Sequence, residues 1–364
     1  LVSQPKLSLR DVRVRRGRAE MVNVPHLDVL EGEVLVIVGP NGAGKTILLE
    51  TLDLLQRPAQ GRVLFEGQPV DGRELALRRR MAVVFQDPLL LRRSVADNVA
   101  MGLRLRGAPR SVRREKAAHW MRQFGIDHLA KRSAVTISGG EAQRANLARA
   151  FALDPEVLLL DEPFSALDQP TREQLLDDLS DALRDTGVTT VFVTHDRAEA
   201  LRLGDRVAVM MGGSIRQVGT AAEVFAAPVD EEVAAFVGVE NIVGGRLQSL
   251  ADGLATIDAG GVAIQAMAPG LDSGAEVLVC LRPENVVLEP ARLDSHTTSA
   301  RNHLQGTVRR ITTAGGQVRV MLDCGFTLVA LITKQSLEEM GLAVGDEVVA
   351  SFKATAVHVI PRGA

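Results

Sequence analysis

The sequence predicts an α/β fold with a largely parallel sheet, followed by a smaller all-β region. In about the first 240 of its 364 residues, short apolar runs of strand length alternate with helical patterns, as is typical of α/β domains. Beyond that point strand-like runs recur without long helices, and glycine-rich turns separate them, which indicates one or two small β-barrels. We therefore expect two domains, 1–240 and 241–364, divided where the composition changes near 228–241.

Five apolar runs in the first domain are expected to be strands of the sheet. They lie at 34–38, 82–85, 157–160, 188–193 and 206–210. Helical patterns follow several of them, at 46–55, 112–124, 143–153, 172–184 and 197–203. The stretch of about 89–134 has helical patterns but no obvious strand, so we expect a helical subdomain inserted between strands. In the second domain the expected strands include 244–250, 276–281, 306–311, 317–322, 328–332 and 347–352.

Composition argues against several classes of protein. The chain has 42 Lys and Arg against 45 Asp and Glu, a formal net charge of −3, so we expect no nucleic-acid partner, because phosphate-backbone binding needs clustered cations. The short basic strings 13–18 and 78–80 are expected to be solvated surfaces. No apolar run approaches the roughly 20 residues of a membrane span. We expect a cytoplasmic protein that reaches a membrane only through a partner.

The strongest motif is a glycine-rich loop between an expected strand and an expected helix. It fits G-x-x-x-x-G-K-[ST] and consists of Gly39, Pro40, Asn41, Gly42, Ala43, Gly44, Lys45 and Thr46. Glycines let backbone N–H groups curl around a phosphate chain, and the start of the helix adds a positive dipole end. Lys45 is expected to contact the β- and γ-phosphates, and Thr46 to offer its hydroxyl to Mg²⁺.

A second motif is the acidic pair Asp161-Glu162, which ends a buried apolar run. Parallel sheets bind ligands at the carboxyl ends of their strands, so Asp161 is expected to hold Mg²⁺ and Glu162 to orient or deprotonate the attacking water. A helix cap is the alternative for an isolated acidic pair. The phosphate loop in the same chain favours the nucleotide role.

A third motif, Ser138-Gly139-Gly140-Glu141, has a structural interpretation and a functional one. Ser138 and Glu141 fit the S-x-x-E capping box at the start of a helix. That interpretation does not explain two consecutive glycines in a first helical turn, where glycine weakens a helix. Glycines there allow the backbone to approach an anion closely.

Together these motifs resemble the nucleotide-binding subunit of ABC transporters, whose motifs all occur here in order over about the first 240 residues. The resemblance implies an ABC-type P-loop NTPase domain that hydrolyses ATP with Mg²⁺. It identifies Gln86 with the Q-loop, Asp168 with the D-loop and His195 with the switch histidine that contacts the γ-phosphate. The implied catalytic residues are Glu162, His195 and Gln86, and the implied Mg²⁺ contacts are Thr46, Gln86 and Asp161.

The resemblance also implies partners. Ser138, Gly139, Gly140 and Glu141 would complete the ATP site of a second copy of the chain, so a homodimer is expected. The helical subdomain would contact integral-membrane permease subunits at the cytoplasmic face of the membrane. An extracytoplasmic substrate-binding protein would deliver the cargo.

Two positions depart from the family's pattern. Arg16 stands where the family usually stacks adenine on an aromatic residue, and the chain contains no Tyr; adenine would then stack on the guanidinium, or base recognition would be loose. Ile47 stands where the family usually has a small hydroxyl residue. Ile47 still offers a backbone N–H to phosphate, so we expect little consequence.

The cargo must be inferred from the second domain. Leu281-Arg282-Pro283-Glu284 resembles a turn in the OB-like accessory barrels of importer ATPases. Residues of about 299–360 resemble the molybdate-binding Mop or TOBE barrel. By that analogy the expected oxyanion contacts are Ser299, Arg301, Lys353 and Thr355. The bound anion would be the imported cargo or cytoplasmic molybdate or tungstate. We therefore expect an importer ATPase for tungstate or molybdate.

Several alternatives remain open at this point. The barrel could serve only for dimerisation. The cargo could be sulfate, ferric ion, a polyamine or a sugar, because all such importers share similar barrels. A non-transport ABC ATPase, or an oxyanion-storage protein with a decayed ATPase, is disfavoured by the intact nucleotide motifs and by the lack of zinc modules and coiled coils.

Overall fold

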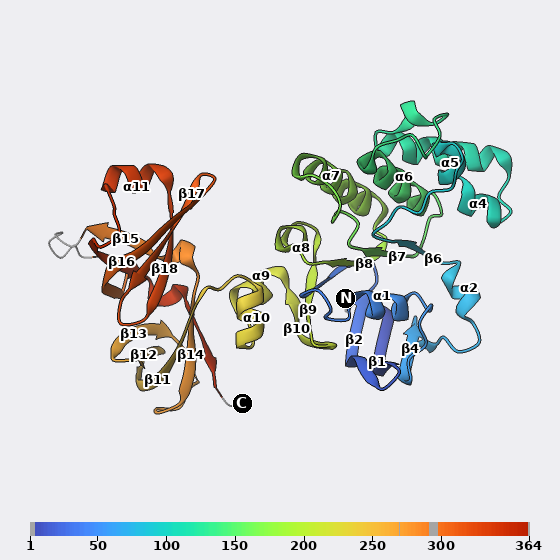
Figure 1. The fold of residues 1–364 in the computed structure, drawn as a ribbon. Helices are drawn as coiled ribbons and strands as arrows, with labels where there is room; N and C mark the ends of the chain where they lie inside the picture. The colour runs from blue at the N-terminus through green and yellow to red at the C-terminus, as the bar shows by residue number, and fades with distance from the viewer. Residues whose placement is uncertain (1–3, 269, 291–297, 363–364) are drawn as a thin grey trace. The chain divides into compact units, whose positions relative to one another are not determined.

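The computed structural model describes residues 4–268, 270–290 and 298–362. The chain divides into two compact units, Leu1–Val224 and Phe225–Ala364, each coloured along its own part of the chain in Figure 1. No helix in the described part of the chain is both long and apolar enough to cross a membrane.

The first unit is organised around a six-stranded sheet in the order β10-β9-β3-β8-β7-β6. Its strands are β3 (Val34–Val38), β6 (Met81–Val84), β7 (Val157–Asp161), β8 (Thr189–Thr194), β9 (Arg206–Met211) and β10 (Ser214–Thr220). The first five of these strands pair in parallel, while β10 pairs antiparallel with β9 at the edge. Every residue of β3, β7 and β8 is buried, which explains their nearly continuous apolar sequences. The five strands predicted from apolar runs are confirmed within one or two residues.

Helices lie between these strands along the chain, and one more follows β10. They are α1 (Lys45–Leu52), α2 (Glu74–Arg78), α3 (Val95–Val99), α4 (Met101–Leu105), α5 (Arg110–Gln123), α6 (Gly139–Phe151), α7 (Gln169–Thr186), α8 (Arg197–Leu203) and α9 (Ala221–Ala226). Residues 89–134 hold α3, α4, α5 and the short 3₁₀ helix η1 (Asp127–Leu129), with an isolated bridge between Ser94 and Ser133 as their only β contact. Trp120 of α5 packs on Phe151 of α6 with ring centroids 4.7 Å apart, and these helices lie together in Figure 1.

A second, antiparallel sheet in the first unit was not predicted from the sequence. Its order is β2-β1-β4-β5, with β1 (Pro5–Arg16), β2 (Ala19–Leu30), β4 (Gln60–Phe65) and β5 (Gln68–Pro69). The basic string 13–18 lies at the tip of the β1–β2 hairpin and is exposed there except for Val14. The string 78–80 was also expected to be a solvated surface. That expectation was wrong for Arg80, which binds Glu66 and Glu156 beside the buried Lys6.

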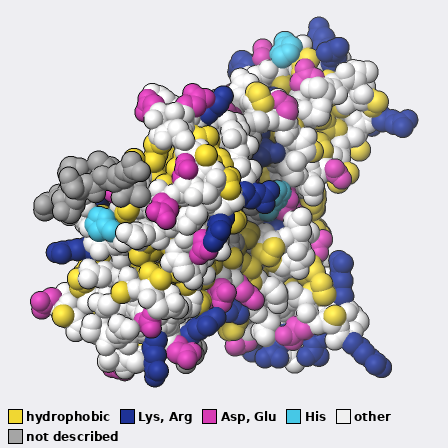
Figure 2. Space-filling view, turned by 60° about the vertical axis from the view of Figure 1, so that its left-hand side comes forward, with side chains coloured by type: hydrophobic (Ala, Val, Ile, Leu, Met, Phe, Trp, Pro, Cys, Tyr) yellow, Lys and Arg dark blue, Asp and Glu magenta, His cyan; other side chains and the backbone are white. Residues whose placement is uncertain are grey.

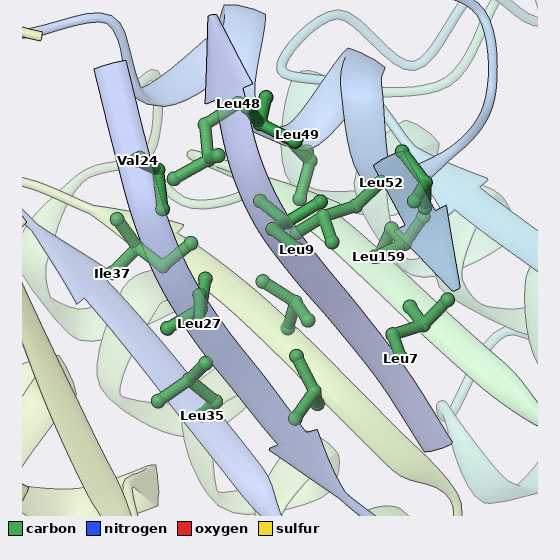
Figure 3. Packing of buried hydrophobic residues seen from close by; sticks show 14 of the residues in the cluster. Leu7, Leu9, Val24, Leu27, Leu35, Ile37, Leu48, Leu49, Leu52 and Leu159 are labelled. Atoms are coloured by element: carbon green, nitrogen blue, oxygen red, sulfur yellow. The ribbon is translucent and has the colours of Figure 1, made fainter. Parts of the chain in front are cut away.

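The core of the first unit lies between the two sheets and α1. Leu7 and Leu9 of β1, Leu35 and Ile37 of β3, and Leu48 of α1 belong to one buried cluster, and Figure 3 shows them pointing toward one another. Burial of this kind stabilises a fold by about 25 cal/mol per Å² of apolar surface. The start of α1 is therefore fixed against both sheets, which places the glycine-rich loop that precedes it.

The second unit contains two antiparallel five-stranded sheets. The first has the order β13-β12-β11-β14-β20 and the second β15-β19-β16-β17-β18. The strands are β11 (Asn241–Ala251), β12 (Leu254–Ala259), β13 (Val262–Met267), β14 (Glu276–Leu281), β15 (Val287–Pro290), β16 (Asn302–Ala314), β17 (Gln317–Asp323), β18 (Thr327–Thr333), β19 (Glu347–Phe352) and β20 (Val357–Pro361). The unit also holds α10 (Glu231–Phe236), η2 (Pro283–Asn285), α11 (Lys334–Met340) and η3 (Ala354–Ala356).

One apolar cluster joins both sheets of the second unit. It includes Leu247 and Ile257 from the first sheet, and Val308 and Val320 from the second. Cys280 and Cys324 are buried free thiols. On the face of the molecule shown in Figure 2, Lys and Arg side chains are interspersed with Asp and Glu and form no continuous basic patch.

Candidate functional site

The glycine-rich loop joins β3 to α1 with the geometry that its glycines permit. Gly42 and Gly44 have positive φ angles of 81° and 97°, which cost other residues conformational energy. A Cβ at Gly39 would lie 2.2 Å from the Met210 carbonyl oxygen, so a side chain there would collide with β9. The loop therefore needs glycine at these positions, because its backbone passes close to the sheet and then turns into the helix.

Lys45 lies in the centre of this loop. Its side chain is 5% exposed, and its ammonium donates to the carbonyl oxygens of Gly39 at 2.9 Å and Pro40 at 3.2 Å. The same nitrogen lies 3.4 Å from Oε1 of Glu162. A buried ammonium with several oxygen partners can exchange them for phosphate oxygens.

Thr46 and Asp161 form a pair of oxygen donors beside Lys45. The Thr46 hydroxyl donates to Oδ1 of Asp161 at 3.3 Å. Burial raises the pKa of the Asp161 carboxyl, with the neighbouring Glu162 charge adding to the effect. Hydroxyl and carboxylate oxygens are the ligands that Mg²⁺ prefers, usually one or two together with substrate phosphates. A divalent cation here would stabilise the ionised form of this buried carboxyl, so the two residues fit the ion.

Glu162 is held by contacts on three sides. Its φ of 42° lies in the left-handed region, which non-glycine residues adopt at a cost of order 1–3 kcal/mol. Its N–H donates to the Val193 carbonyl of β8 at 2.9 Å. Its Oε2 lies 2.9 Å from Nδ1 of His195, opposite the Lys45 contact of Oε1. The structure thus brings the predicted base and the predicted switch histidine together from the ends of β7 and β8.

A pocket of about 410 Å³ brings together residues of the glycine-rich loop with Gln86 and Glu162. Its lining includes Asn41, Gly42, Gly44, Lys45, Thr46, Ile47, Gln86 and Glu162. Met21 of β2 also lines this pocket, although no motif in the sequence indicated it. Arg16 lies exposed at the end of β1 and outside this lining. Its role in stacking adenine stays a prediction, and Met21 is the residue of the β1–β2 hairpin that lies nearer the loop.

Ser138 and Glu141 form the capping box of α6. The Ser138 hydroxyl accepts from the Glu141 N–H at 3.3 Å, and the Ser138 N–H donates to the Glu141 carboxylate at 2.7 Å. These bonds lower the pKa of Glu141. The segment lies on the surface, outside the pocket that holds Lys45. A Cβ at Gly139 would meet no atom within 4 Å, whereas one at Gly140 would lie 2.8 Å from the Thr171 methyl.

The residues after Glu162 connect it to α7. Ser165 donates from its N–H and its hydroxyl to the Glu162 carbonyl. Asp168 is exposed immediately before α7. Arg172 of α7 contacts the Leu167 carbonyl at 3.2 Å and Asp196 at 3.4 Å. The segment with Asp168 and the segment with His195 are therefore linked through one side chain.

The four predicted oxyanion residues lie at one end of the β16–β19 pair. Ser299 and Arg301 precede β16, Lys353 and Thr355 follow β19, and the strands pair there as Asn302 with Phe352. All four are exposed.

His303, which the sequence analysis did not single out, fixes the backbone at this end. Its Nε2 donates to the Ala300 carbonyl at 3.0 Å, and its Nδ1 lies 2.9 Å from the Ser351 hydroxyl, which in turn contacts Glu289 at 3.1 Å. The sequence carried no signal for the contacts of Ser351 with His303 and Glu289, because these depend on strand pairing.

Comparison with known proteins identifies both parts of the chain. The family model described as ABC transporter matches residues 22–165, and the TOBE domain model matches residues 298–359. The molybdate/tungstate import ATP-binding protein WtpC of Pyrococcus horikoshii is 40% identical, over 92% of this chain and 94% of the relative. The sulfate/thiosulfate import ATP-binding protein CysA of Thermosynechococcus vestitus is 33% identical, over 92% and 93%.

Solved structures resemble the ATPase part. The structure of cbiO1 from Clostridium perfringens, part of the ABC transporter complex cbiONQ, covers 65% of this chain and 96% of its own, with a TM-score of 0.58 and 28% identity. A bacterial ABC transporter cassette solved as a dimer covers 59% and 98%, with a TM-score of 0.54 and 28% identity.

Proposed function

The chain belongs to the ATP-binding subunits of ABC transporters, and we propose that it works as a homodimer that drives import of an oxyanion, tungstate or molybdate. In this proposal the dimer binds integral-membrane permease subunits at the cytoplasmic face of the membrane. An extracytoplasmic binding protein delivers the anion to the permease. The ATPase activity follows from the family.

The observation that carries the ATPase chemistry is the convergence of Lys45, Thr46, Asp161, Glu162 and His195 around one pocket. Thr46 and Asp161 would hold Mg²⁺, with Gln86 beside them, and the ion would neutralise charge on the phosphates. Lys45 binds the phosphate chain together with the loop N–H groups. Glu162 accepts the proton of the attacking water, and His195 holds the Glu162 carboxylate in place.

The base assignment is tested by Glu162→Gln. The amide keeps the shape of the side chain but cannot accept the proton, so kcat should fall about 10²–10⁴-fold, while ATP still binds and joins two copies. Hydrolysis is measured by phosphate release and dimerisation by light scattering with ATP. Glu173→Gln, an exposed change on α7, is the control and should leave kcat unchanged. Hydrolysis by Glu162→Gln at the wild-type rate would refute the role of Glu162.

Dimerisation is supported by the position of Ser138, Gly139 and Gly140. They lie at the start of α6, outside the pocket of their own chain, with Ser138 and Gly139 exposed and Gly140 partly exposed. Helix N-termini are anion-binding elements, so this one is free to contact the nucleotide of a second copy. The dimeric cassette structure supports the same arrangement by similarity.

The oxyanion cargo is supported by the second unit. Arg301 and Lys353 place two cations at one end of the β16–β19 pair, with the hydroxyls of Ser299 and Thr355 beside them in the chain. Cations and hydroxyls are donors for a tetrahedral dianion. The relative named for molybdate and tungstate matches this chain at higher identity than the one named for sulfate, and sulfate is the second candidate among anionic cargoes.

A further inference from the structure

The loop that carries Gln86 is held by two side chains of α6. Arg149 donates to the Pro88 carbonyl at 3.0 Å and to the Leu89 carbonyl at 3.2 Å. Asn146, one turn earlier, lies with its Nδ2 3.5 Å from the Phe85 carbonyl. Gln86 thus lies between backbone groups that α6 anchors on both sides.

The anchor holds the loop in an uncommon conformation. Leu89 has a φ of 44° and is 66% exposed, so apolar burial does not compensate for the left-handed backbone. The Arg149 guanidinium contacts both carbonyls around this residue. A third bond, from Arg149 to Oδ1 of Asn146 at 2.5 Å, aligns the two side chains. Only the planar fork of arginine presents several donors in fixed directions in this way.

The same helix begins at the glycine pair. α6 runs from Gly139 to Phe151, about 20 Å at 1.5 Å per residue, with Asn146 and Arg149 in its second half. A displacement of its first turn is therefore carried to the Gln86 loop by one rigid element.

An amide side chain without hydrogen-bond partners lies on the same face of α6. Gln143 is 2% exposed, and neither its Oε1 nor its Nε2 has a hydrogen-bond partner. Residues three apart on a helix lie on the same face, so Gln143 is one turn before Asn146, on the side of the Gln86 loop. An unpaired buried amide destabilises a protein, so its presence here indicates a function that offsets this cost.

We propose that Asn146 and Arg149 are positioning residues that set how far Gln86 reaches into the nucleotide pocket, and that Gln143 supplies a further bond to the loop during turnover. The inference rests on the proposed role of Gln86. Through α6, the contact of the glycine pair with a second copy reaches the Gln86 of its own chain.

The test is a double-mutant cycle between Arg149→Lys and Gln86→Ala. Lysine keeps the charge but cannot hold two carbonyls and Asn146 together. Arg149→Lys should lower kcat about tenfold and leave the KM for ATP within about twofold, because positioning affects the reacting geometry rather than binding. In the Gln86→Ala background the same change should have less than a roughly twofold effect. A purely structural role would give equal losses in both backgrounds.

Controls separate the possible failures. Arg106→Lys changes a neighbouring arginine that donates to the Leu153 carbonyl at 3.0 Å, and it should leave kcat unchanged. If Arg149→Lys melts early, Asn146→Asp repeats the cycle, since it keeps the acceptor for Arg149 and removes the donor to Phe85. Additive losses, or a raised KM at unchanged kcat, would overturn the inference. An unchanged kcat for Gln86→Ala alone would instead refute the role of Gln86.

Gln143→Leu tests the role of Gln143 through two measurements, the melting temperature and kcat. Removing an unpaired buried amide should raise the melting temperature, yet kcat should fall severalfold if Gln143 bonds the loop during turnover. A higher melting temperature with unchanged kcat would remove Gln143 from the proposal.

Discussion

Asp161 and Glu162 are adjacent carboxylates with different surroundings. The Asp161 side chain is buried and meets the Thr46 hydroxyl, whereas Glu162 lies between the Lys45 ammonium and the His195 ring. The left-handed backbone at Glu162 turns the two side chains in different directions from the end of β7. These surroundings agree with the proposal that Asp161 holds a cation and Glu162 takes part in proton transfer, and both roles stay predictions.

Asp53 gives a pH-dependent prediction. Burial raises its pKa from 3.8 to about 7, and Arg78 only partly offsets this. Between about pH 4 and pH 7, the Asp53 carboxyl is therefore protonated in the folded state but ionised in the unfolded state. Its contribution to stability is fully present below pH 4 and is lost as the pH rises through 7. Relative to wild type, Asp53→Asn should gain about 1–3 kcal/mol of unfolding free energy between pH 5 and pH 8.

Urea unfolding at pH 5 and pH 8 measures this difference. Asp71→Asn, a change at an exposed position, is the control and should show no such gain. A stability difference for Asp53→Asn that stays constant across this pH range would contradict the burial argument.

Among the elements, the buried parallel strands could be predicted and the antiparallel hairpin could not. Strands such as β3 and β8 are continuous apolar runs, which stand out in a sequence. β1 instead mixes polar and apolar residues: Lys6 and Ser8 are buried polar residues, and its second half alternates the buried Val12 and Val14 with exposed polar side chains. Its arginines suggested a solvated surface. The same error explains Met21, because the pocket wall it forms depends on the hairpin that was missed.

The start of α6 gives a prediction that separates contacts within the chain from contacts with a second copy. A Cβ at Gly139 meets no atom within 4 Å, and alanine favours helices by about 1 kcal/mol over glycine. Gly139→Ala should therefore leave the melting temperature unchanged or slightly higher. ATPase activity should still fall at least about tenfold, because the new methyl group would meet the nucleotide of the partner copy.

Gly140→Ala is the matched comparison for this variant. Its Cβ would lie 2.8 Å from the Thr171 methyl, so it should lower the melting temperature as well as the activity. Full activity in Gly139→Ala would argue that the glycine pair serves only the helix start.

For the molecule as a whole, the ATPase chemistry was easier to predict than the cargo. The nucleotide residues belong to motifs with fixed local spacing, such as Gly39–Thr46. The proposed anion residues form two short segments, around Arg301 and around Lys353, that only the β16–β19 register brings to one place. The contact between His303 and Ser351 depends on the same register.

The most direct test of the proposed cargo is calorimetric titration of the purified full chain with tungstate, molybdate and sulfate. We predict that tungstate and molybdate bind at least about tenfold more tightly than sulfate. The double variant Arg301→Ala/Lys353→Ala should lose this binding, whereas Lys334→Ala, which removes an exposed cation of α11, should retain it. Equal affinity for sulfate, or no binding of either anion by the folded wild-type chain, would contradict the proposal.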